Sequence, residues 1–344
     1  MMLFFGAGAS KPVGIPTMKE MSRMFENSID LGEEERELYL DIKNSLDSDN
    51  LEDILTVLND LINNYVPVRY ITSYIKKLFD LAHLESLTDL LTGGDSEFHN
   101  NLREIYEHLT LIEKEKLEAL KSKILTFIRE NCVLKEESRK DALKTYNQLF
   151  ETLRYPIFHE IFTTNYDLVV DKYIESTKQP YHDGFNNGLW DPKGYEQNIE
   201  FKILKLHGAI DQYVTEKGRI VKVGVLGATR TVDGEELKEA IIYPMREKEV
   251  YKDPFFELFT RLKTSLLSEE ICIIIGYSFG DEHIRNIFFD AVKRNPEIRI
   301  FMINTNAQKI RDDLEPIKDN IEPIEGKFGE ERVFEELNKK LSEV

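Results

Sequence analysis

Two apolar runs in the last quarter of the sequence constrain the fold more than any other feature. Residues 271–275 and 298–303 are short runs rich in β-branched and other apolar residues, and a segment with helical spacing, 282–294, separates them. Strands that are apolar on both faces are typical of parallel sheets, which are covered by helices on both sides. The pattern therefore predicts an α/β protein with a parallel sheet.

The same alternation extends over much of the chain. Further strand-like runs lie at residues 2–5, 157–162, 201–206 and 241–243, and further helical patterns at 18–25, 168–176, 255–267, 310–317 and 330–340. Strands that alternate with helices imply a doubly wound, Rossmann-like sheet. We also expect a hairpin beside the main sheet, formed by residues 212–214 and 220–223.

Residues 29–154 differ in character from the rest of the chain. They are rich in Glu, Lys and Leu, and their apolar residues recur at helical intervals, as in Leu51, Leu55, Leu58 and Ile62. We therefore expect a Rossmann-like domain formed by residues 1–28 and 155–344, with a large all-helical insertion at 29–154. The apolar stripes of the insertion either complete a local core or form an oligomer interface.

Composition excludes several classes of protein. The net charge of −18, from 45 basic and 63 acidic residues, disfavours direct binding to nucleic acid or to an anionic membrane. Only two cysteines, Cys132 and Cys272, are present, so neither a disulfide framework nor a four-cysteine zinc site can form, and we expect no metal. No apolar run approaches the roughly 18 residues that span a bilayer, and we expect a cytoplasmic protein.

Each strong strand run ends in a polar or glycine-bearing phrase. These phrases are Gly-Ala-Gly-Ala-Ser at 6–10, Thr-Thr-Asn-Tyr-Asp at 163–167, His-Gly-Ala at 207–209, Gly-Tyr-Ser-Phe-Gly-Asp at 276–281 and Asn-Thr-Asn at 304–306. Ligands of open parallel sheets bind outside the carboxyl ends of the strands, so we expect the five phrases to converge on one crevice. Glycines in the first phrase let backbone amides approach a pyrophosphate.

The polar residues in these phrases also have structural interpretations. Asn165 and Asp167 are suited to cap the helix that follows them, and Ser278 is suited to cap the helix that starts near Asp281. Asn304 can end its strand as a turn residue. His207 can serve as a general base at neutral pH, or it can be a buried histidine at a strand end. The residues alone leave both interpretations open.

In their order, the phrases resemble those of the sirtuin family, the silent-information-regulator-like proteins that consume NAD. The matching phrases are the glycine loop at 6–10 with Gly-Ile-Pro at 14–16, Asn165-Tyr166-Asp167, His207-Gly208, Gly276-Tyr277-Ser278 and Asn304. The chain departs from the deacylases of the family in its cysteines and in two motifs. It lacks the cysteines of their zinc ribbon, and Thr164 replaces a glutamine. Met18 replaces a phenylalanine, and Thr17 and Lys19 replace an aspartate and an arginine.

The resemblance is nearest to the bacterial sirtuin-like NADases of anti-phage defence, and it implies a Rossmann-like fold with no zinc ribbon. It implies NAD+ as the substrate, which is cleaved to ADP-ribose and nicotinamide with water as the acceptor. Asn165 would hold the ribose and the water, His207 would act as the base, and Asp167 would orient the ribose or its loop. The residues implied to bind the nucleotide are Gly6, Ala7, Gly8, Ala9, Ser10, Pro16, Thr164, Gly276, Ser278 and Asn304.

Two other functions fit the same motifs. One is a regulatory or assembly subunit that binds NAD or ADP-ribose without turnover, and the other is a zinc-free protein deacylase or ADP-ribosyltransferase. Because an uncontrolled NADase harms its own cell, we expect control by homo-oligomerisation and by a partner protein. The resemblance implies a HerA-type ATPase or an Argonaute-like protein as that partner.

Overall fold

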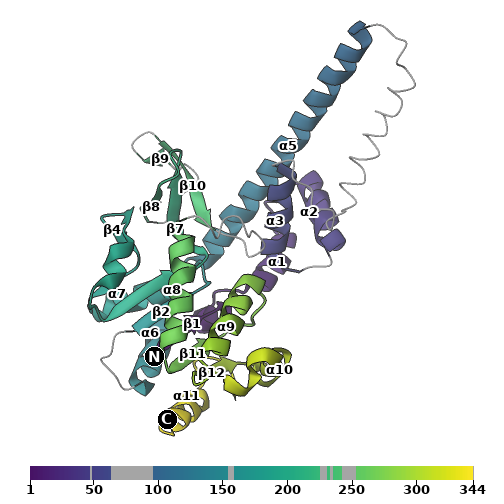
Figure 1. Cartoon of the computed structure of the whole chain (residues 1–344). Helices are drawn as coiled ribbons and strands as arrows, with labels where there is room; N and C mark the ends of the chain where they lie inside the picture. Colours follow the sequence, from purple (N-terminus) through teal and green to yellow (C-terminus); the bar gives the residue numbers. More distant parts are fainter. Residues whose placement is uncertain are drawn as a thin grey trace. The chain divides into compact units, whose positions relative to one another are not determined.

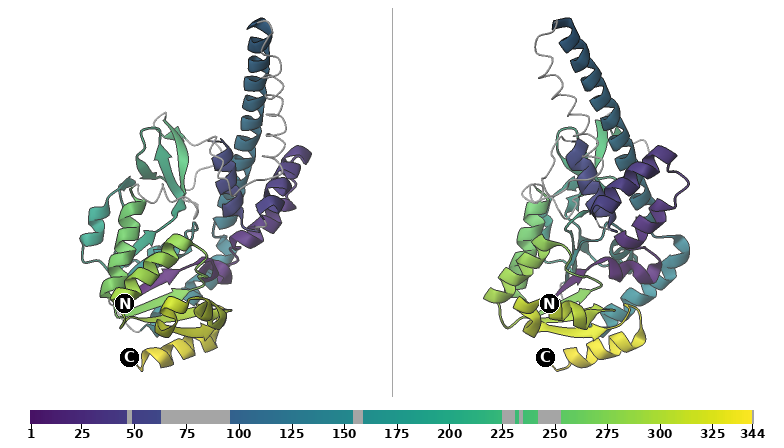
Figure 2. Two further views of the ribbon diagram at one scale, coloured as in Figure 1. Left: turned by 45° about the vertical axis from the view of Figure 1, so that its right-hand side comes forward. Right: turned by 90° about the vertical axis from the view of Figure 1, so that its right-hand side faces the viewer.

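The computed structural model describes residues 1–46, 49–62, 96–153, 159–224, 231–232, 235–241 and 253–343 (Figures 1 and 2). The chain forms two compact units. One unit comprises Met1–Thr17 with Asn131–Val344, and the other comprises Met18–Glu130. The domain boundaries expected after residues 28 and 154 stay a prediction.

A seven-stranded parallel sheet is the centre of the first unit. Its strands are β1 (Met2–Phe5), β2 (His159–Thr163), β3 (Tyr181–His182), β6 (Phe201–Lys205), β11 (Ile271–Ile275), β12 (Arg299–Asn304) and β13 (Ile321–Glu325). They lie in the order β13-β12-β11-β1-β2-β6-β3, and every neighbouring pair is parallel. Apart from the two-residue β3, this is the Rossmann strand order, which reverses between β1 and β11. The predicted doubly wound, Rossmann-like sheet is confirmed.

Helices pack on both faces of this sheet. The helices of the unit are η1 (Ala7–Val13), η2 (Glu136–Ser138), α6 (Arg139–Thr152), α7 (Val169–Thr177), η3 (Pro192–Glu196), α8 (Phe255–Ser268), α9 (Glu282–Arg294), α10 (Ala307–Asp313), η4 (Glu315–Asn320) and α11 (Glu331–Leu341). On one face, Phe4 and Ile274 join a buried apolar cluster with α8 and α9. On the other face, Phe5 contacts Tyr146 of α6, which in turn stacks on Tyr173 of α7. Alternate positions along each strand thus supply both layers of core.

A second sheet continues directly from β6. Its strands are β4 (Phe185–Asn186), β5 (Leu189–Trp190), β7 (Gly208–Thr215), β8 (Ile220–Lys222), β9 (Thr231–Val232) and β10 (Glu235–Ile241), in the order β4-β5-β8-β7-β10-β9. All its pairs are antiparallel. The predicted hairpin is confirmed, since Tyr213 of β7 pairs with Val221 of β8.

Two local predictions need correction. The strand expected at 241–243 does not extend the parallel sheet, because its described residue, Ile241, ends the antiparallel β10; Ile242 and Tyr243 lie outside the described residues. The helix expected at 310–317 is split into α10 and η4, because the backbone of Leu314 is not helical and Pro316 has no amide hydrogen to donate.

An element that was not predicted lies directly after β1. The glycine loop itself forms the 3-10 helix η1, whereas the helix predicted at 18–25 is confirmed. The helical pattern at 18–25 forms α1 (Met18–Glu26), which belongs to the second unit. β13 was not predicted at all, and it lies at the edge of the sheet, where its Pro323 is tolerated.

The elements described in the second unit are helices. They form α1, α2 (Glu33–Leu46), α3 (Leu51–Ile62) and most of α5 (Ser96–Cys132). Phe25 of α1 packs edge-on against Tyr39 of α2 and Phe127 of α5. The described part of residues 29–154 contains no strand, as the prediction of a helical insertion requires.

Candidate functional site

Two glycine loops cross where the strand order reverses. After β1, Gly6 donates its backbone N–H to the carbonyl of Ile275 and Gly8 donates to the carbonyl of Gly276, both at 2.9 Å. A Cβ on Gly8 would lie 2.5 Å from the Cα of Gly276, and a Cβ on Gly276 would overlap Gly8. Gly276 also has a φ of +66°, which favours glycine. Contact between the loops is therefore a reason for these glycines that does not depend on a ligand.

Asn165 is tied to the first of these loops. Its Nδ2 donates to the carbonyl of Gly6 at 2.9 Å and to the hydroxyl of Ser10 at 3.2 Å. Its backbone N–H donates to Oγ1 of Thr163, the last residue of β2, at 3.0 Å. Both of these side-chain hydrogen bonds join the ends of β1 and β2, and neither is a capping bond to α7.

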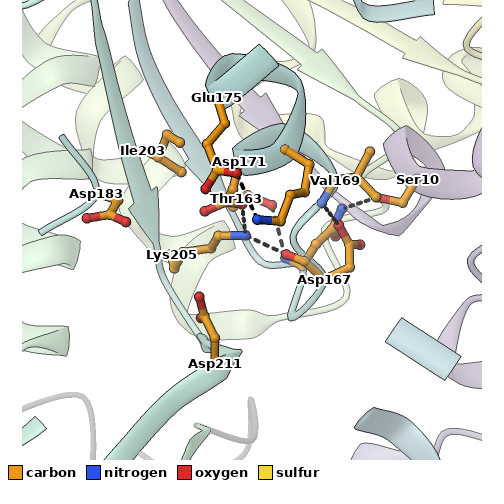
Figure 3. Close-up of polar contacts among 12 residues, drawn as sticks. Ser10, Thr163, Asp167, Val169, Asp171, Glu175, Asp183, Ile203, Lys205 and Asp211 are labelled. Carbon is orange, nitrogen blue, oxygen red and sulfur yellow. Dashed lines mark hydrogen bonds and ion pairs between the residues drawn. The ribbon is translucent and has the colours of Figure 1, made fainter. Parts of the chain in front are cut away.

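Ser10 contacts Asp167 as well as Asn165, and Figure 3 shows both Ser10 and Asp167. Both residues are buried, and the Ser10 hydroxyl is hydrogen-bonded to the Asp167 carboxylate. Oδ1 of Asp167 accepts the backbone N–H of Val169, the first residue of α7, at 3.0 Å. Burial raises the pKa of Asp167, although the charge of Lys205 opposes the shift. Asp167 thus has the structural role at the helix start, and its catalytic role stays a prediction.

His207 is held by a carboxylate from another strand end. It follows β6 and is 3% exposed, and its Nε2 lies 3.0 Å from Oδ2 of Asp281. Asp281 caps α9, since its Oδ1 accepts the backbone N–H groups of His283 at 2.8 Å and Ile284 at 3.2 Å. Burial acts to raise the pKa of Asp281, but the hydrogen bond and charge of His207 and the two backbone hydrogen bonds lower it overall. Asp281 is therefore an ionised acceptor for the imidazole.

The predicted residues on the β11–β12 side have different surroundings. Asn304 ends β12, and its Nδ2 donates to the carbonyl of Tyr277 at 3.2 Å, so it supports the loop after β11. Its Oδ1 accepts the backbone N–H of Asn306 at 3.1 Å, as expected of a turn residue. Ser278 is exposed in the same loop. Asp281, rather than Ser278, makes the capping bonds to α9.

The remaining predicted residues lie along the loops after β1 and β2. The backbone N–H of Thr164 donates to the carbonyl of Phe5, the last residue of β1, at 3.2 Å. In η1, Ala7 is exposed and Ala9 is buried. Pro16, which follows η1 in the sequence, is half-buried. Direct hydrogen bonds thus connect the loops that hold Gly6, Gly8, Ser10, Asn165, Asp167 and Gly276. His207 is bonded separately to Asp281.

Sequence reasoning missed two residues, Lys205 and Asp281. Lys205 is 3% exposed; its ammonium donates to the carbonyl of Asp167 and lies 2.6 Å from Oδ2 of Asp171 (Figure 3). A lysine at the end of an apolar strand run was a usable signal, because a buried ammonium requires a partner. Asp281 stood in the quoted phrase at 276–281, but its partner His207 is 74 residues away and nothing local relates the two.

The strand order and the polar loops define a Rossmann-like α/β protein with a candidate site at the carboxyl edge of its sheet. The family model of the SIR2-like domain matches residues 159–324. This segment is therefore SIR2-like, and the resemblance to the sirtuin family inferred from the motifs is confirmed. Asn165, His207, Gly276 and Asn304 lie inside the matched segment, and the glycine loop after β1 precedes it.

Solved structures of Sir2 proteins are similar to this chain. A mutant Sir2 homologue in complex with ADP-ribose is 14% identical, with a TM-score of 0.48 over 99% of this chain and 92% of that chain. A Sir2 homologue in complex with NAD is 12% identical, with a TM-score of 0.46 over 99% of this chain and 89% of that chain. No curated protein matches the sequence.

Two further findings concern metals and membranes. Within the described ranges, no group of three or more His, Cys, Asp and Glu side chains is arranged to hold a metal ion. No helix in the described part of the chain is both long enough and apolar enough to cross a membrane.

Proposed function

We propose that the chain is an NAD+ glycohydrolase, which cleaves NAD+ to ADP-ribose and nicotinamide. The observation that carries the proposal is the attachment of Asn165 to Gly6 and Ser10, at the edge of the sheet where a Rossmann fold binds nucleotides. The match of residues 159–324 to the SIR2-like family model supports it.

The chemistry requires orientation more than acid catalysis. Cleavage of the bond between nicotinamide and ribose C1′ develops oxocarbenium character, and nicotinamide leaves as a neutral molecule. The protein has then to hold the ribose and direct a water molecule at C1′, a positioning effect that contributes several kcal/mol. Asn165 suits this task, because its Nδ2 is bound to the loop and its Oδ1 is the atom to accept a hydrogen bond from a ribose hydroxyl or water.

His207 supplies the base in this proposal. As water adds to C1′, the C1′–N bonding pair leaves with nicotinamide, and the proton of the water passes to the imidazole. Water is the acceptor because the chain has only two cysteines, Cys132 and Cys272, and lacks the zinc ribbon of the deacylases.

We further propose that NAD+ depletion serves anti-phage defence, controlled by homo-oligomerisation and by a HerA-type or Argonaute-like partner. The shared motifs are the support for this role.

The test is nicotinamide release from NAD+ by the purified chain, without any acyl-peptide. We expect Asn165→Ala and His207→Ala each to lower the rate of nicotinamide release at least about 100-fold. Binding of NAD+ should stay measurable by calorimetry. Asn27→Ala is the matched control, because Asn27 is exposed at the end of α1 in the second unit. In phage-infected cells, NAD+ should fall with the unchanged chain and not with Asn165→Ala.

The alternatives predict other outcomes of the same test. A binding subunit without turnover would bind NAD+ and release no nicotinamide, alone or with its partner. A deacylase or ADP-ribosyltransferase would release nicotinamide only when an acceptor protein is present. Full hydrolysis by both the Asn165 and the His207 variants would refute the assignment of the site.

A further inference from the structure

We propose that Asp281 is a positioning residue for His207: it fixes the imidazole as the Nε2–H tautomer, so that Nδ1 is the nitrogen that takes up the proton. The proposal deepens the proposed NADase function and rests on it for the identity of the proton donor, which is the attacking water. Which nitrogen of His207 acts is not apparent from the sequence, because the partner of the ring comes from the loop before α9.

Both carboxylate oxygens of Asp281 accept hydrogen bonds. Oδ1 accepts the backbone N–H groups of His283 and Ile284 at the start of α9, and Oδ2 lies 3.0 Å from Nε2 of His207. An ionised carboxylate only accepts hydrogen bonds, so Nε2 must carry the hydrogen in this contact. A neutral imidazole has a single ring hydrogen, and its other nitrogen, Nδ1, is therefore the one with a free lone pair.

The pair is held rigidly in the fold. The side chains of His207 and Asp281 are 4% and 6% exposed. Asp281 is fixed by its capping bonds and by α9, whose Ile284 and Phe288 are fully buried in the apolar core. The ring of Phe259 lies 6.5 Å from the imidazole, centroid to centroid. Because the imidazole is oriented before the reaction, little free energy is needed to reorient it during proton transfer.

The carboxylate also stabilises the product of proton transfer. When water adds to ribose C1′, its proton forms a bond to Nδ1, and the ring becomes an imidazolium with hydrogens on both nitrogens. The positive charge is then paired with Asp281 in a buried setting, where the interaction is stronger than in water. Loss of the proton to solvent returns His207 to its starting form.

The decisive variant is Asp281→Asn. The new side chain has almost the same shape, and its amide oxygen can still cap α9. With that oxygen committed, its NH2 group faces Nε2 and donates to it, which forces the ring hydrogen onto Nδ1. We expect kcat for nicotinamide release to fall about 10- to 100-fold or more, with little change in KM, since loss of a hydrogen-bond partner that orients a metal-ligating histidine has an effect of roughly 10- to 100-fold.

The matched control is Asp191→Asn. Asp191 is also an N-cap aspartate, and its side chain accepts the backbone N–H of Lys193 at the start of η3. The same loss of charge at this cap should leave kcat unchanged, because Asp191 is bonded to His182 only through its carbonyl and not to His207. An equal loss of kcat in both variants would overturn the positioning role.

A spectroscopic measurement reads the tautomer directly. In the full chain labelled with 15N-histidine, the ring shifts of neutral His207, assigned by the signal that His207→Gln removes, should report hydrogen on Nε2. In Asp281→Asn the ring should change to the Nδ1–H form. Because the first measurement uses the unchanged chain, a folding defect of the variant does not obscure it.

The outcomes separate this inference from the proposed function. Hydrogen on Nδ1 in the unchanged chain, or the same tautomer and kcat in Asp281→Asn, would overturn the role of Asp281. No nicotinamide release by the unchanged chain, with hydrogen on Nε2, would refute the NADase proposal and still support fixation of the ring by Asp281.

Discussion

At the scale of single residues, the site depends on close contact between backbones. Gly8 and Gly276 allow the loops after β1 and β11 to cross, and Asn165 then bonds to the carbonyl of Gly6 in the first loop. A side chain at either glycine would separate the loops and move the group to which Asn165 is bonded. The position of the Asn165 amide therefore depends on the absence of a side chain at Gly8 and at Gly276.

Gly276→Ala should destabilise the protein by roughly 2–5 kcal/mol, from the unfavourable φ of +66° together with the overlap with Gly8. Gly218→Ala is the matched control, since Gly218 has a φ of +76° and no atom within 4 Å of an added Cβ. It should cost only about 1 kcal/mol. Urea unfolding of both variants measures the difference, and equal losses would show that the crossing of the loops is not tight.

At the scale of elements, α7 is joined to β6 by a buried ion pair. Nζ of Lys205 lies 2.6 Å from Oδ2 of Asp171, and both side chains are 3% exposed. The same ammonium donates to the carbonyl of Asp167, just before α7 (Figure 3). The helix and the turn that carries Asn165 are thus attached to the strand that leads to His207.

Lys205→Met should destabilise the protein by about 3–5 kcal/mol, because it leaves the Asp171 carboxylate buried without its partner. Adding Asp171→Leu should recover much of this loss, since a buried pair can be replaced by apolar groups. Lys172→Met is the control: the Lys172–Glu175 pair is exposed and worth about 0.5 kcal/mol or less. Thermal and urea unfolding would contradict the prediction if the double variant were no more stable than Lys205→Met.

At the scale of the whole molecule, the acidic excess extends into the interior of the first unit. Lys222 is paired with Asp183, and its Nζ lies 3.3 Å from Oδ2 of Asp211. Oδ1 of Asp211 is buried and has no hydrogen-bond partner among the described residues. Burial raises the pKa of Asp211 despite the charge of Lys222, so an ionised Asp211 lowers the free energy of unfolding.

Two aspartates should therefore give stability a pH dependence of opposite sign. For Asp211 the folded pKa is above 3.8, so the folded state holds the proton longer and stability falls as pH rises from about 3.8 through the folded value. For Asp281 the folded pKa is below 3.8, so its contribution is full above about 3.8 and is lost as pH falls through the folded value.

The measurement is urea unfolding of Asp211→Asn and Asp281→Asn against the unchanged chain across this pH range. The stability of Asp211→Asn, relative to the unchanged chain, should improve as pH rises. Asp281→Asn should lose its relative disadvantage as pH falls. Parallel curves for the three proteins would show that neither carboxyl is perturbed in the fold.

Local pattern was enough to predict most of the elements of the parallel sheet. Residues 271–275 form β11 within the predicted bounds, and residues 282–294 form α9. Such segments are predictable because the spacing of apolar residues indicates whether a strand is buried on both faces or a helix is buried along one stripe. β13 escaped the prediction because Ile-Glu-Pro-Ile-Glu is too polar for a buried strand, and only an edge position tolerates it.

The sequence by itself determined the class of fold and the set of strand-end residues, because apolar periodicity and the identity of Asn165 and His207 are local properties. Only the tertiary structure decided which side chains meet. The contacts of Asn165 with Gly6 and of His207 with Asp281 join residues 159 and 74 positions apart. The order of the strands in the sheet and the loops that follow them bring these residues together, and no local periodicity encodes that order.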